Sequence, residues 1–426
     1  MAHYMAVNEG SSSHKYGVFE EKGDVLKDGP EALELIAKGN IQKVHVAGES
    51  PFVLEFKGET EEGTQELRSH AGAIGFSSER LDERMPGFKP DAVGYKWVYA
   101  GEENNGTHFL YRPREGETEV VERTREFEED FPRHNPYYLA ALTAFKTLYP
   151  EVPGIGPMER AFHYSIPLEA RARGVPASFT DEYEEPLGIG FHSASLRSAL
   201  YNASGVLDKP IADLNLIIMH LGGTGTVSAV RNGLSVDTSL QYVANGGTIH
   251  NTAFGGAVDP NLVLSHMDEK GIDTGEMRKI LAKEGGLQAL SGIEGGDMKE
   301  ILEMAEAGDP RAIFAKNAFI YGSKSLFGAY AYAALHNEVD AVVFSGGIGE
   351  KSAAIREGIL DDAGIYDFRV DAFANSNNSR EINSPDSKPV LILPTDEELI
   401  VAFYAAVTNK LGRDLKAEEM TGFLGR

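Results

Sequence analysis

Three short segments rich in glycine or serine could contact a phosphate group. Residues 8–15 (NEGSSSHK) offer hydroxyls, an amide and one ammonium group on a tight turn. Residues 220–226 (HLGGTGT) and 344–350 (FSGGIGE) each place glycines directly after an apolar run. Glycine lets a ligand approach the backbone closely, while hydroxyls, backbone N–H groups and a lysine suit phosphate oxygens. Together the three segments predict loops around one phosphate-bearing ligand.

Carboxylates and histidines near these segments could act on such a ligand. Glu397 lies in residues 394–398 (PTDEE), directly after an apolar run, where a carboxylate could cap a helix or hold Mg²⁺. His192 lies in a glycine–aromatic segment, residues 190–193 (GFHS), and His134 precedes Asn–Pro. A structural role is the alternative for each histidine, and the residue types alone leave both interpretations open.

The glycines at residues 222–225 do not fit two common nucleotide motifs. The Lys-Ser/Thr ending of a Walker P-loop is missing, and the absence of a following helix argues against a dinucleotide fingerprint. Two strand–loop–strand hairpins would instead hold phosphates, and a strand–loop–helix unit at residues 341–360 would hold adenosine. This combination suggests an actin-like, sugar-kinase-type architecture in which the nucleotide lies between two domains.

Periodic apolar patterns predict the elements that must position these loops. Strands alternate with helices along the second half of the chain, which indicates the α/β class. Residues 6–19 predict a hairpin whose turn is residues 8–13, and Asn232-Gly233 predict another hairpin turn. The other predicted strands are residues 43–46, 52–56, 92–99, 214–221, 226–230, 234–236, 340–344 and 389–393. The predicted helices are residues 30–37, 69–83, 137–148, 277–284, 298–307, 312–335, 352–360 and 399–411.

Composition restricts the class of protein. A chain of 426 residues with 42% hydrophobic residues predicts two domains, and the prolines at residues 150–157 predict the main boundary. The absence of cysteine excludes disulfides and thiolate zinc sites. No apolar run approaches the roughly 18 residues of a membrane span, and no signal pattern opens the chain, which predicts a cytoplasmic protein. The formal charge of −25 argues against nucleic acid or anionic membrane as a partner.

Eight motifs occur in an order that resembles acetate kinase and its propionate and butyrate kinase relatives. The resemblance runs over the whole chain, and its motifs are residues 8–15, 134–136, 161–163, 190–192, 220–222, 231–239, 344–350 and 394–399. It implies a two-domain actin-like (ASKHA, ribonuclease H-like) α/β fold with the nucleotide in the interdomain cleft. Residues 1–158, joined by a C-terminal helix at 398–426, would form one domain, and residues 159–397 would form the other. A homodimer is also implied.

The resemblance further implies in-line phosphoryl transfer between ATP, as co-substrate with Mg²⁺, and a short carboxylate or its acyl phosphate. His192 would stabilise the transferring phosphoryl group, and Glu159 and Lys96 would complete the catalytic set. Asn8 and Glu397 would hold the metal. The nucleotide would be bound by Asn8, Ser11, Ser13, Lys15, His220, Gly222, Gly223, Asp297, Lys299, Gly347, Ile348 and Gly349. The acceptor would contact Lys96, Val98, His134 and Phe191.

This sequence departs from the family pattern mainly on the acceptor side. Lys96 stands where the family has a substrate arginine, and residues 251–256 (NTAFGG) lack the family's second arginine. Lysine lacks the planar fork that binds a carboxylate at two points. Further differences are Glu159 for a catalytic aspartate, Leu196 for a histidine, Gly223 for a phosphate-loop asparagine and Lys299 for an arginine. Arg160 and Arg133 could bring a guanidinium back to the site, with surface positions as the alternative.

Two classes of function follow from these observations. The first is a phosphotransferase acting on acetate or on another carboxylate, because the nucleotide-side motifs are kept. The second is a nucleotide-binding family member that has lost transfer activity and works as a sensor or partner subunit, because both substrate arginines are replaced. A kinase with a different acceptor lies between the two.

Overall fold

The computed structural model describes the chain except for residues 102, 133, 177–189, 242–245 and 426. By its internal contacts the chain forms two compact units. The first unit comprises Met1–Tyr164, Ser193–Ser198 and Asp396–Arg426, and the second comprises Ser165–His192 and Ala199–Thr395. The domain boundaries expected from the sequence, at residues 158/159 and 397/398, remain a prediction.

The first unit contains a nine-stranded sheet with the order β5-β4-β3-β2-β1-β6-β9-β7-β8. β1 is parallel to β6, and β6 is parallel to β9, so the carboxyl ends of these three strands lie at one edge. β1 to β5 form an antiparallel meander. The strands are β1 His3–Gly10, β2 Ser13–Glu21, β3 Leu33–Gln42, β4 Ser50–Phe56, β5 Glu59–Gln65, β6 Ala92–Tyr95, β7 Thr107–Arg112, β8 Gly116–Glu117 and β9 Gly154–Pro157.

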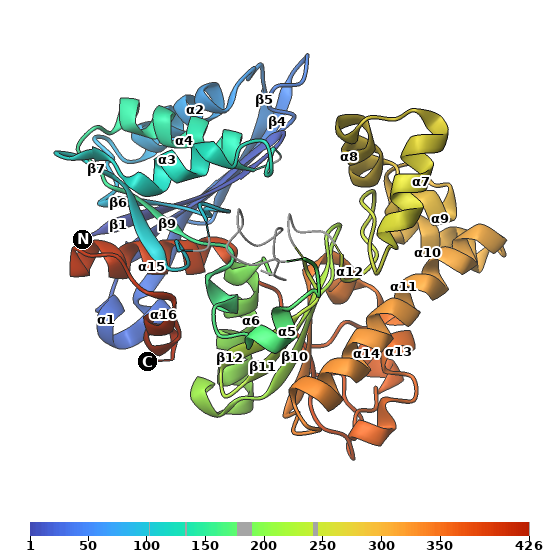
Figure 1. Ribbon diagram of the computed structural model, residues 1–426. Coiled ribbons are helices and arrows are strands. Elements are labelled where there is room, and N and C mark those ends of the chain that lie inside the picture. Colours follow the sequence, from blue (N-terminus) through green and yellow to red (C-terminus); the bar gives the residue numbers. More distant parts are fainter. Residues whose placement is uncertain (102, 133, 177–189, 242–245, 426) are drawn as a thin grey trace. The chain divides into compact units, whose positions relative to one another are not determined.

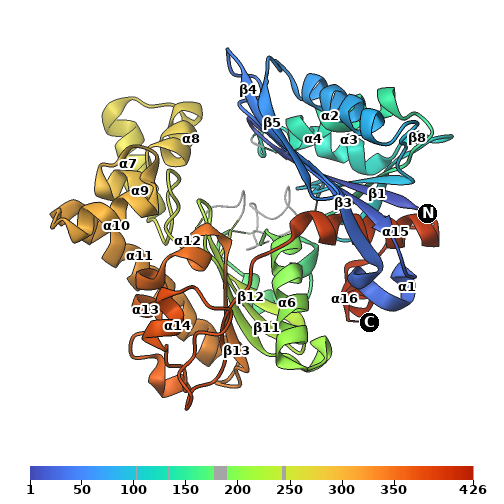
Figure 2. The same ribbon diagram turned by 180° about the vertical axis from the view of Figure 1, so that it is seen from behind.

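Helices cover both faces of this sheet. α2 (His70–Arg84), α3 (Glu119–Glu126) and α4 (Asn135–Leu148) lie on one face, and α15 (Glu397–Leu411) lies on the other (Figures 1 and 2). Residues 400–408 of α15 are all buried, as expected for a helix enclosed by its unit. α15 approaches β6 closely at Gly94, where a Cβ atom would lie 3.0 Å from the Val401 carbonyl oxygen. Two short helices, α1 (Val25–Asp28) and α16 (Ala417–Leu424), complete the unit.

The second unit contains a five-stranded sheet with the order β12-β11-β10-β13-β14. β10 is antiparallel to β11 and parallel to β13, which is parallel to β14. The same order and directions relate β3-β2-β1-β6-β9 of the first unit, so both units share one topology. The strands are β10 Leu216–His220, β11 Thr226–Arg231, β12 Leu234–Thr238, β13 Ala341–Ser345 and β14 Val390–Ile392.

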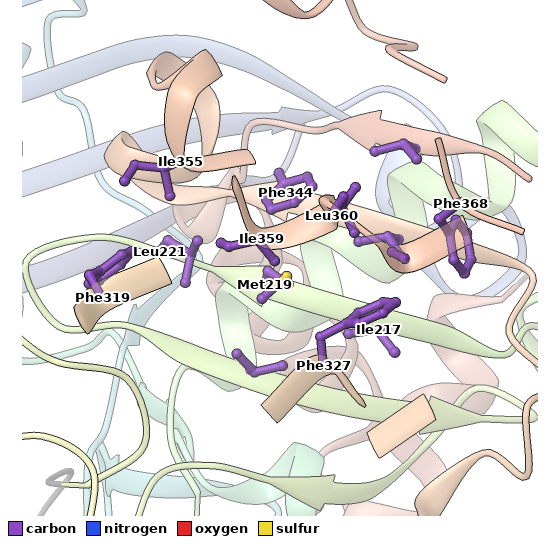
Figure 3. Close-up of a cluster of buried hydrophobic side chains, with 14 of the residues drawn as sticks. Ile217, Met219, Leu221, Phe319, Phe327, Phe344, Ile355, Ile359, Leu360 and Phe368 are labelled. Atoms are coloured by element: carbon purple, nitrogen blue, oxygen red, sulfur yellow. The ribbon is translucent and has the colours of Figure 1, made fainter. Parts of the chain in front are cut away.

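Alternate residues of β10 form the centre of the second unit's core. Ile217, Met219 and Leu221 point to one face of the sheet, as the two-residue period of a strand requires (Figure 3). They belong to one buried cluster with Phe344 of β13, Phe319 and Phe327 of α11, and Ile355, Ile359 and Leu360 of α13. The helices of the second unit are α5 Leu168–Arg171, α7 Pro260–Lys270, α8 Thr274–Lys283, α9 Gly286–Ser291, α10 Met298–Glu306, α11 Pro310–Ala329, α12 Gly346–Lys351, α13 Ala353–Leu360 and α14 Ala372–Ser376. α6 (Ser193–Leu207) begins in the first unit and continues in the second from Ala199.

Most predicted elements are confirmed, and four are wrong. The turn predicted at residues 8–13 is confined to Ser11 and Ser12, because β1 continues to Gly10 and β2 begins at Ser13. The helix predicted at residues 30–37 is a short 3-10 turn, Gly29–Ala32, followed by β3, which pairs with strands on both sides. Residues 43–46, predicted as a strand, form a turn with positive φ at Lys43 and His45. The glycines after β13 are not a loop but the start of α12. None of the helices in the described part of the chain is long and apolar enough to cross a membrane.

Candidate active site

Three neighbouring parallel strands of the first unit place polar side chains at one edge of the sheet. Asn8 lies near the end of β1, Lys96 directly follows β6, and Glu159 follows β9. Backbone hydrogen bonds continue past the strands, from Lys96 N–H to the Val7 carbonyl (3.2 Å) and from Glu159 N–H to the Trp97 carbonyl (2.8 Å). The sheet itself therefore brings these three residues, predicted from the sequence as site residues, into one place.

Lys96 lies between two carboxylates. Its Nζ is 2.8 Å from Glu397 Oε2 and 3.6 Å from Glu159 Oε2, and its side chain is 15% exposed. Burial by itself lowers the pKa of a lysine, but here the charges of Glu159 and Glu397 outweigh burial and raise the pKa of Lys96 above its ordinary value. Lys96 is therefore a fixed ammonium charge at neutral pH.

Glu397 stands in the first turn of α15 and has hydrogen-bond donors on both of its oxygens. Asn8 Nδ2 donates to Oε2 at 3.0 Å, and Ser195 Oγ donates to Oε1. Asp396 caps the helix by accepting from Leu399 N–H at 2.8 Å, which fixes the turn that carries Glu397. The sequence analysis missed Ser195, although its position three residues after His192 in a glycine–aromatic segment was a usable signal.

The remaining carboxylates make this region rich in negative charge. Glu159 Oε1 accepts from Ala194 N–H at 3.3 Å, and Glu398 Oε1 lies 3.4 Å from Asn8 Nδ2. Burial raises the pKa of Glu159, while Lys96 opposes that rise. Burial also raises the pKa of Glu398, and the charge of Glu397 adds to it. Three carboxylates around one ammonium favour the approach of a further cation.

The oxygen donors here suit Mg²⁺. Glu397 and Glu398 supply carboxylate oxygens, and Asn8 Oδ1 is oriented by a 3.3 Å hydrogen bond from Tyr138 Oη. In the described residues, no group of three His, Asp or Glu side chains is arranged to hold a metal by itself. Mg²⁺ commonly takes only one or two protein carboxylates and completes its shell with water and phosphate oxygens. The donor set of Asn8, Glu397 and Glu398 therefore fits this ion.

The predicted phosphate segment at residues 8–15 is the tip of the β1–β2 hairpin. Asn8 pairs with Lys15 in the strand register, and Ser11 and Lys15 are exposed while Ser13 is partly buried. Beneath the tip, Glu9 is buried and its two oxygens lie 2.7 Å from His14 Nδ1 and 3.4 Å from His70 Nε2. This buried cluster anchors the turn, and the sequence analysis did not predict it.

His192 and His220 meet in the second unit. Their ring centroids are 5.0 Å apart with the rings at 60°. His220 ends β10, and its Nδ1 lies 3.0 Å from Ser345 Oγ at the end of the neighbouring β13. His192 precedes α6 with φ of 64°, a conformation that costs a non-glycine residue about 1 kcal/mol or more and occurs often at functional sites. Gly222 and Gly223 follow β10 after Leu221.

The predicted adenosine residues lie on two elements of the second unit. Ile348 and Gly349 belong to α12 and donate backbone N–H groups to the Leu221 carbonyl at 2.9 and 3.2 Å, while Gly347 is exposed. Asp297 caps α10 by accepting from Lys299 N–H at 3.0 Å. Within the described contacts, no hydrogen bond or ion pair joins residues 297 or 299 to residues 347–349. Their joint position beside one adenosine remains a prediction.

The predicted acceptor residues are mostly enclosed. Val98 and Phe191 are buried, and His134 is the residue before α4. Asn135 of the same motif donates to the carbonyls of Tyr99 and Thr124 at 3.1 and 3.2 Å, so this part of the motif is structural.

Of the two arginines considered as replacements, the structure describes only Arg160. Arg160 is buried, with Nη1 3.4 Å from the Gly101 carbonyl and its guanidinium 5.6 Å from the Tyr99 ring, so the alternative of a surface position is wrong. Arg133 lies outside the described residues. Ala253, where the family pattern has an arginine nearby, is buried.

Comparisons with known proteins identify the family of the chain. A family model described as the acetokinase family matches residues 3–403. Acetate kinase of Halothermothrix orenii is 31% identical over 409 residues, covering 93% of this chain and 97% of the relative. Acetate kinase of Bacillus subtilis is 30% identical over 411 residues, covering 94% and 98%.

Solved structures show the same fold. Porphyromonas gingivalis acetate kinase superposes with a TM-score of 0.81 at 27% identity, covering 96% of this chain and 99% of that chain. A propionate kinase from Francisella tularensis gives a TM-score of 0.84 at 25% identity, covering 95% and 98%. The α/β chain with two sheets of one topology therefore has the actin-like fold of these kinases. The chain belongs to the acetokinase family.

Proposed function

We propose that the protein is an acetate kinase-like phosphotransferase that moves a phosphoryl group between ATP and a short carboxylate. The observation that carries this proposal is the Lys96 ammonium, held by Glu159 and Glu397 at the strand edge where Asn8 also lies. Membership of a family of kinases supports the reaction class. That the acceptor is a carboxyl group is a more specific part of the proposal than the reaction class.

In the proposed reaction, a carboxylate oxygen of the acceptor attacks the γ-phosphorus while the bond between that phosphorus and the β,γ-bridging oxygen breaks. The bridging oxygen leaves on ADP with its electron pair. A carboxylate is already a nucleophile, so no general base is needed, and catalysis depends on positioning and on charge neutralisation. Lys96 would neutralise the acceptor, and Glu159 would hold its ammonium in place.

The other site residues would serve the nucleotide. A bound Mg²⁺ on Asn8, Glu397 and Glu398 would neutralise phosphate charge, and Ser195 would keep the Glu397 carboxylate oriented. His192 would donate to the transferring phosphoryl group. The phosphates would contact Ser11, Ser13, Lys15, His220, Gly222 and Gly223, and the adenosine would lie beside Asp297, Lys299, Gly347, Ile348 and Gly349. The acceptor would lie beside Val98, His134 and Phe191.

A second candidate is a nucleotide-binding protein without transfer activity, or a kinase with another acceptor. One observation favours it. The Lys96 ammonium contacts Glu397 at 2.8 Å, so an incoming carboxylate must compete with that carboxylate for a single cation. Lysine offers the incoming carboxylate only a point charge, whereas an arginine would offer that carboxylate two parallel hydrogen bonds.

One assay separates these functions. ATP, Mg²⁺ and a panel of short carboxylates are incubated with the protein and hydroxylamine, which traps any acyl phosphate as a hydroxamate. We expect hydroxamate to form with at least one carboxylate. If none forms while ATP still raises the melting temperature, the kinase proposal fails and the binding protein is supported.

We further propose that the protein works as a homodimer in the cytoplasm, without a nucleic acid or membrane partner. The family resemblance supports the dimer, and the net charge of −25 opposes binding to polyanionic surfaces. Light scattering coupled to size-exclusion chromatography would test the dimer, since a monomeric mass at micromolar concentration contradicts it.

A further inference from the structure

The glycine loop after β10 has a polar side chain facing it from a distant part of the sequence. A Cβ atom built on Gly223 would have Asn251 Nδ2 and Cγ as its nearest neighbours, at 3.6 and 3.8 Å. The Asn251 amide therefore lines the space that the missing side chain of Gly223 leaves. The two residues also share a backbone hydrogen bond, from Asn251 N–H to the Gly223 carbonyl at 2.9 Å.

The segment that carries Asn251 holds two buried polar atoms without a partner. Thr248 Oγ1 and Asn251 Oδ1 have no hydrogen bond in the described part of the chain, and Thr248 is 0% exposed. Thr248 Oγ1 also lies against the loop, 2.5 Å from the position of a Cβ atom on Gly225. Buried polar groups are nearly always satisfied, so unsatisfied atoms behind a glycine loop point to a polar ligand.

The backbone that carries the Asn251 side chain is held in place by hydrogen bonds and close packing. The backbone N–H groups of Leu287 and Gln288, at the start of α9, donate to the carbonyls of His250 and Asn251 at 2.8 and 2.9 Å. Gly296 packs so tightly on the Asn251 carbonyl that a Cβ atom there would lie 2.2 Å from its oxygen. With the backbone fixed on both sides, the amide can donate a hydrogen bond to a ligand at little cost in ordering.

We propose that Asn251 is a phosphate-binding residue, whose side-chain N–H group donates a hydrogen bond to a phosphate oxygen of a nucleotide held by the loop at residues 222–225. The proposal rests on the proposed nucleotide site and adds to it a residue outside the glycine loop. The ligand class is a nucleoside polyphosphate, because a neutral amide and backbone N–H groups around glycines suit phosphate oxygens.

Calorimetric titration with MgATP and with adenosine tests this proposal. In Asn251→Ala we expect the Kd for MgATP to rise about tenfold or more, as for a lost hydrogen bond to a charged group, with the Kd for adenosine unchanged. Asn251→Asp keeps the shape of the side chain but repels phosphate, so it should weaken MgATP further. Asn317→Ala, an exposed asparagine on α11, is the matched control and should bind like the wild type.

A rescue variant keeps the test independent of folding defects. Gly223 has a φ that other residues adopt and no neighbour closer than 3.6 Å to its missing Cβ, so Gly223→Asn in the Asn251→Ala background places an amide on the loop itself. We expect this double variant to recover most of the MgATP affinity. An unchanged MgATP Kd in Asn251→Ala, or an equal loss of MgATP and adenosine binding, would overturn the proposal.

The outcome is separable from that of the kinase proposal. If Asn251→Ala weakens MgATP selectively but the wild type forms no acyl phosphate, the inference holds and the kinase proposal fails. If the wild type turns over and Asn251→Ala binds MgATP normally, the kinase proposal holds and the inference fails. A wild-type protein that binds MgATP no better than adenosine also overturns the inference.

Discussion

Lys96 is the central cation of the candidate site, and its pairing with carboxylates affects how it can bind a substrate. Its ammonium is paired with Glu397 at 2.8 Å and with Glu159 at 3.6 Å, so it is well positioned before any substrate arrives. In the proposed reaction, an acceptor carboxylate would compete with Glu397 and Glu159 for this ammonium.

Lys96→Ala should remove acceptor-dependent turnover. The variant loses the ammonium that pairs with Glu159 and Glu397, and loss of a charge of this kind costs on the order of a thousandfold or more in rate. Hydroxamate formation measures the loss, and the MgATP-induced rise in melting temperature should remain. Lys22→Ala, which removes a half-exposed lysine paired with Glu20, is the control. Unchanged turnover in Lys96→Ala would refute the role given to Lys96.

His250 makes the folded state sensitive to acid. Burial lowers its pKa from 6.5 to about 4, so between these values the unfolded chain binds a proton that the folded chain does not. The contribution is fully present above pH 6.5, and it is lost as the pH falls toward 4. The difference corresponds to about 3 kcal/mol of unfolding free energy.

Urea unfolding at several pH values measures this effect. In His250→Asn the decline in stability between pH 6.5 and 4 should be shallower than in the wild type, although the variant is less stable at pH 7. His266→Asn, at an exposed position on α7, should keep the slope of the wild type. Equal slopes in His250→Asn and the wild type would show that His250 titrates normally in the folded protein.

At the scale of elements, the position of α15 decides where Glu397 stands. The helix can lie close to the sheet because Gly94 has no side chain, and a Cβ atom there would lie 3.0 Å from both Val401 Cγ1 and Ala405 Cβ. Any bulk at this point must move α15 away from β6. The active-site carboxylate at its first turn would move with it.

Gly94→Val should therefore reduce both stability and activity, although residue 94 contacts no substrate in the proposed site. Overpacking of this kind costs about 1–3 kcal/mol. Thermal unfolding and the hydroxamate assay measure the two effects. Gly75→Ala is the control, because this glycine in α2 has no atom within 4 Å of its missing Cβ, and the change should be neutral or slightly stabilising. Full activity in Gly94→Val would show that Glu397 does not depend on this contact.

The sequence predicted elements well where local pattern and tertiary role agree. The hairpin of β11 and β12 follows from Asn232-Gly233, which take the positive φ values that its turn requires. The helix predicted at residues 30–37 is wrong because the local preference of these residues is helical, whereas pairing with β2 and β4 makes residues 33–42 a strand. Tertiary contacts of this kind leave no periodic signal in a short window.

The same distinction holds for the candidate site. Asn8, Lys96, Glu159 and Glu397 were expected from motifs, and the structure brings them together. Ser195 and Tyr138 were not predicted, since each contacts a partner far away in the sequence. The buried Glu9–His14–His70 cluster was not predicted either, since His70 joins the Glu9–His14 pair from a distant segment. Whether a serine or tyrosine forms a hydrogen bond to a site residue depends on the fold, and the spacing of residues along the sequence does not predict it.

At the scale of the whole molecule, charge repulsion works against the folded state. The chain has 65 acidic and 40 basic side chains, a formal charge of −25. Many surface ion pairs are present, but exposed pairs contribute little each. Compacting a chain with so large a net charge costs free energy that salt reduces by screening.

Raising NaCl from 20 to 500 mM should thus increase the melting temperature by about 2 °C or more, as screening lowers the repulsion. Differential scanning fluorimetry measures the change, and an equal osmolality of sucrose serves as the comparison for effects that do not depend on charge. A fall in melting temperature with salt would mean that attractive pairs outweigh the net repulsion.

The division of the chain between its two units also affects the order in which the units fold during translation. The strands of the second unit are complete once Ile392 has been made, whereas α15, which covers one face of the first sheet, begins only at Glu397. The usual expectation is that the N-terminal part of a chain folds first on the ribosome. Here we expect the opposite order, because one apolar face of the first sheet stays uncovered until α15, which follows the strands of the second unit, has emerged.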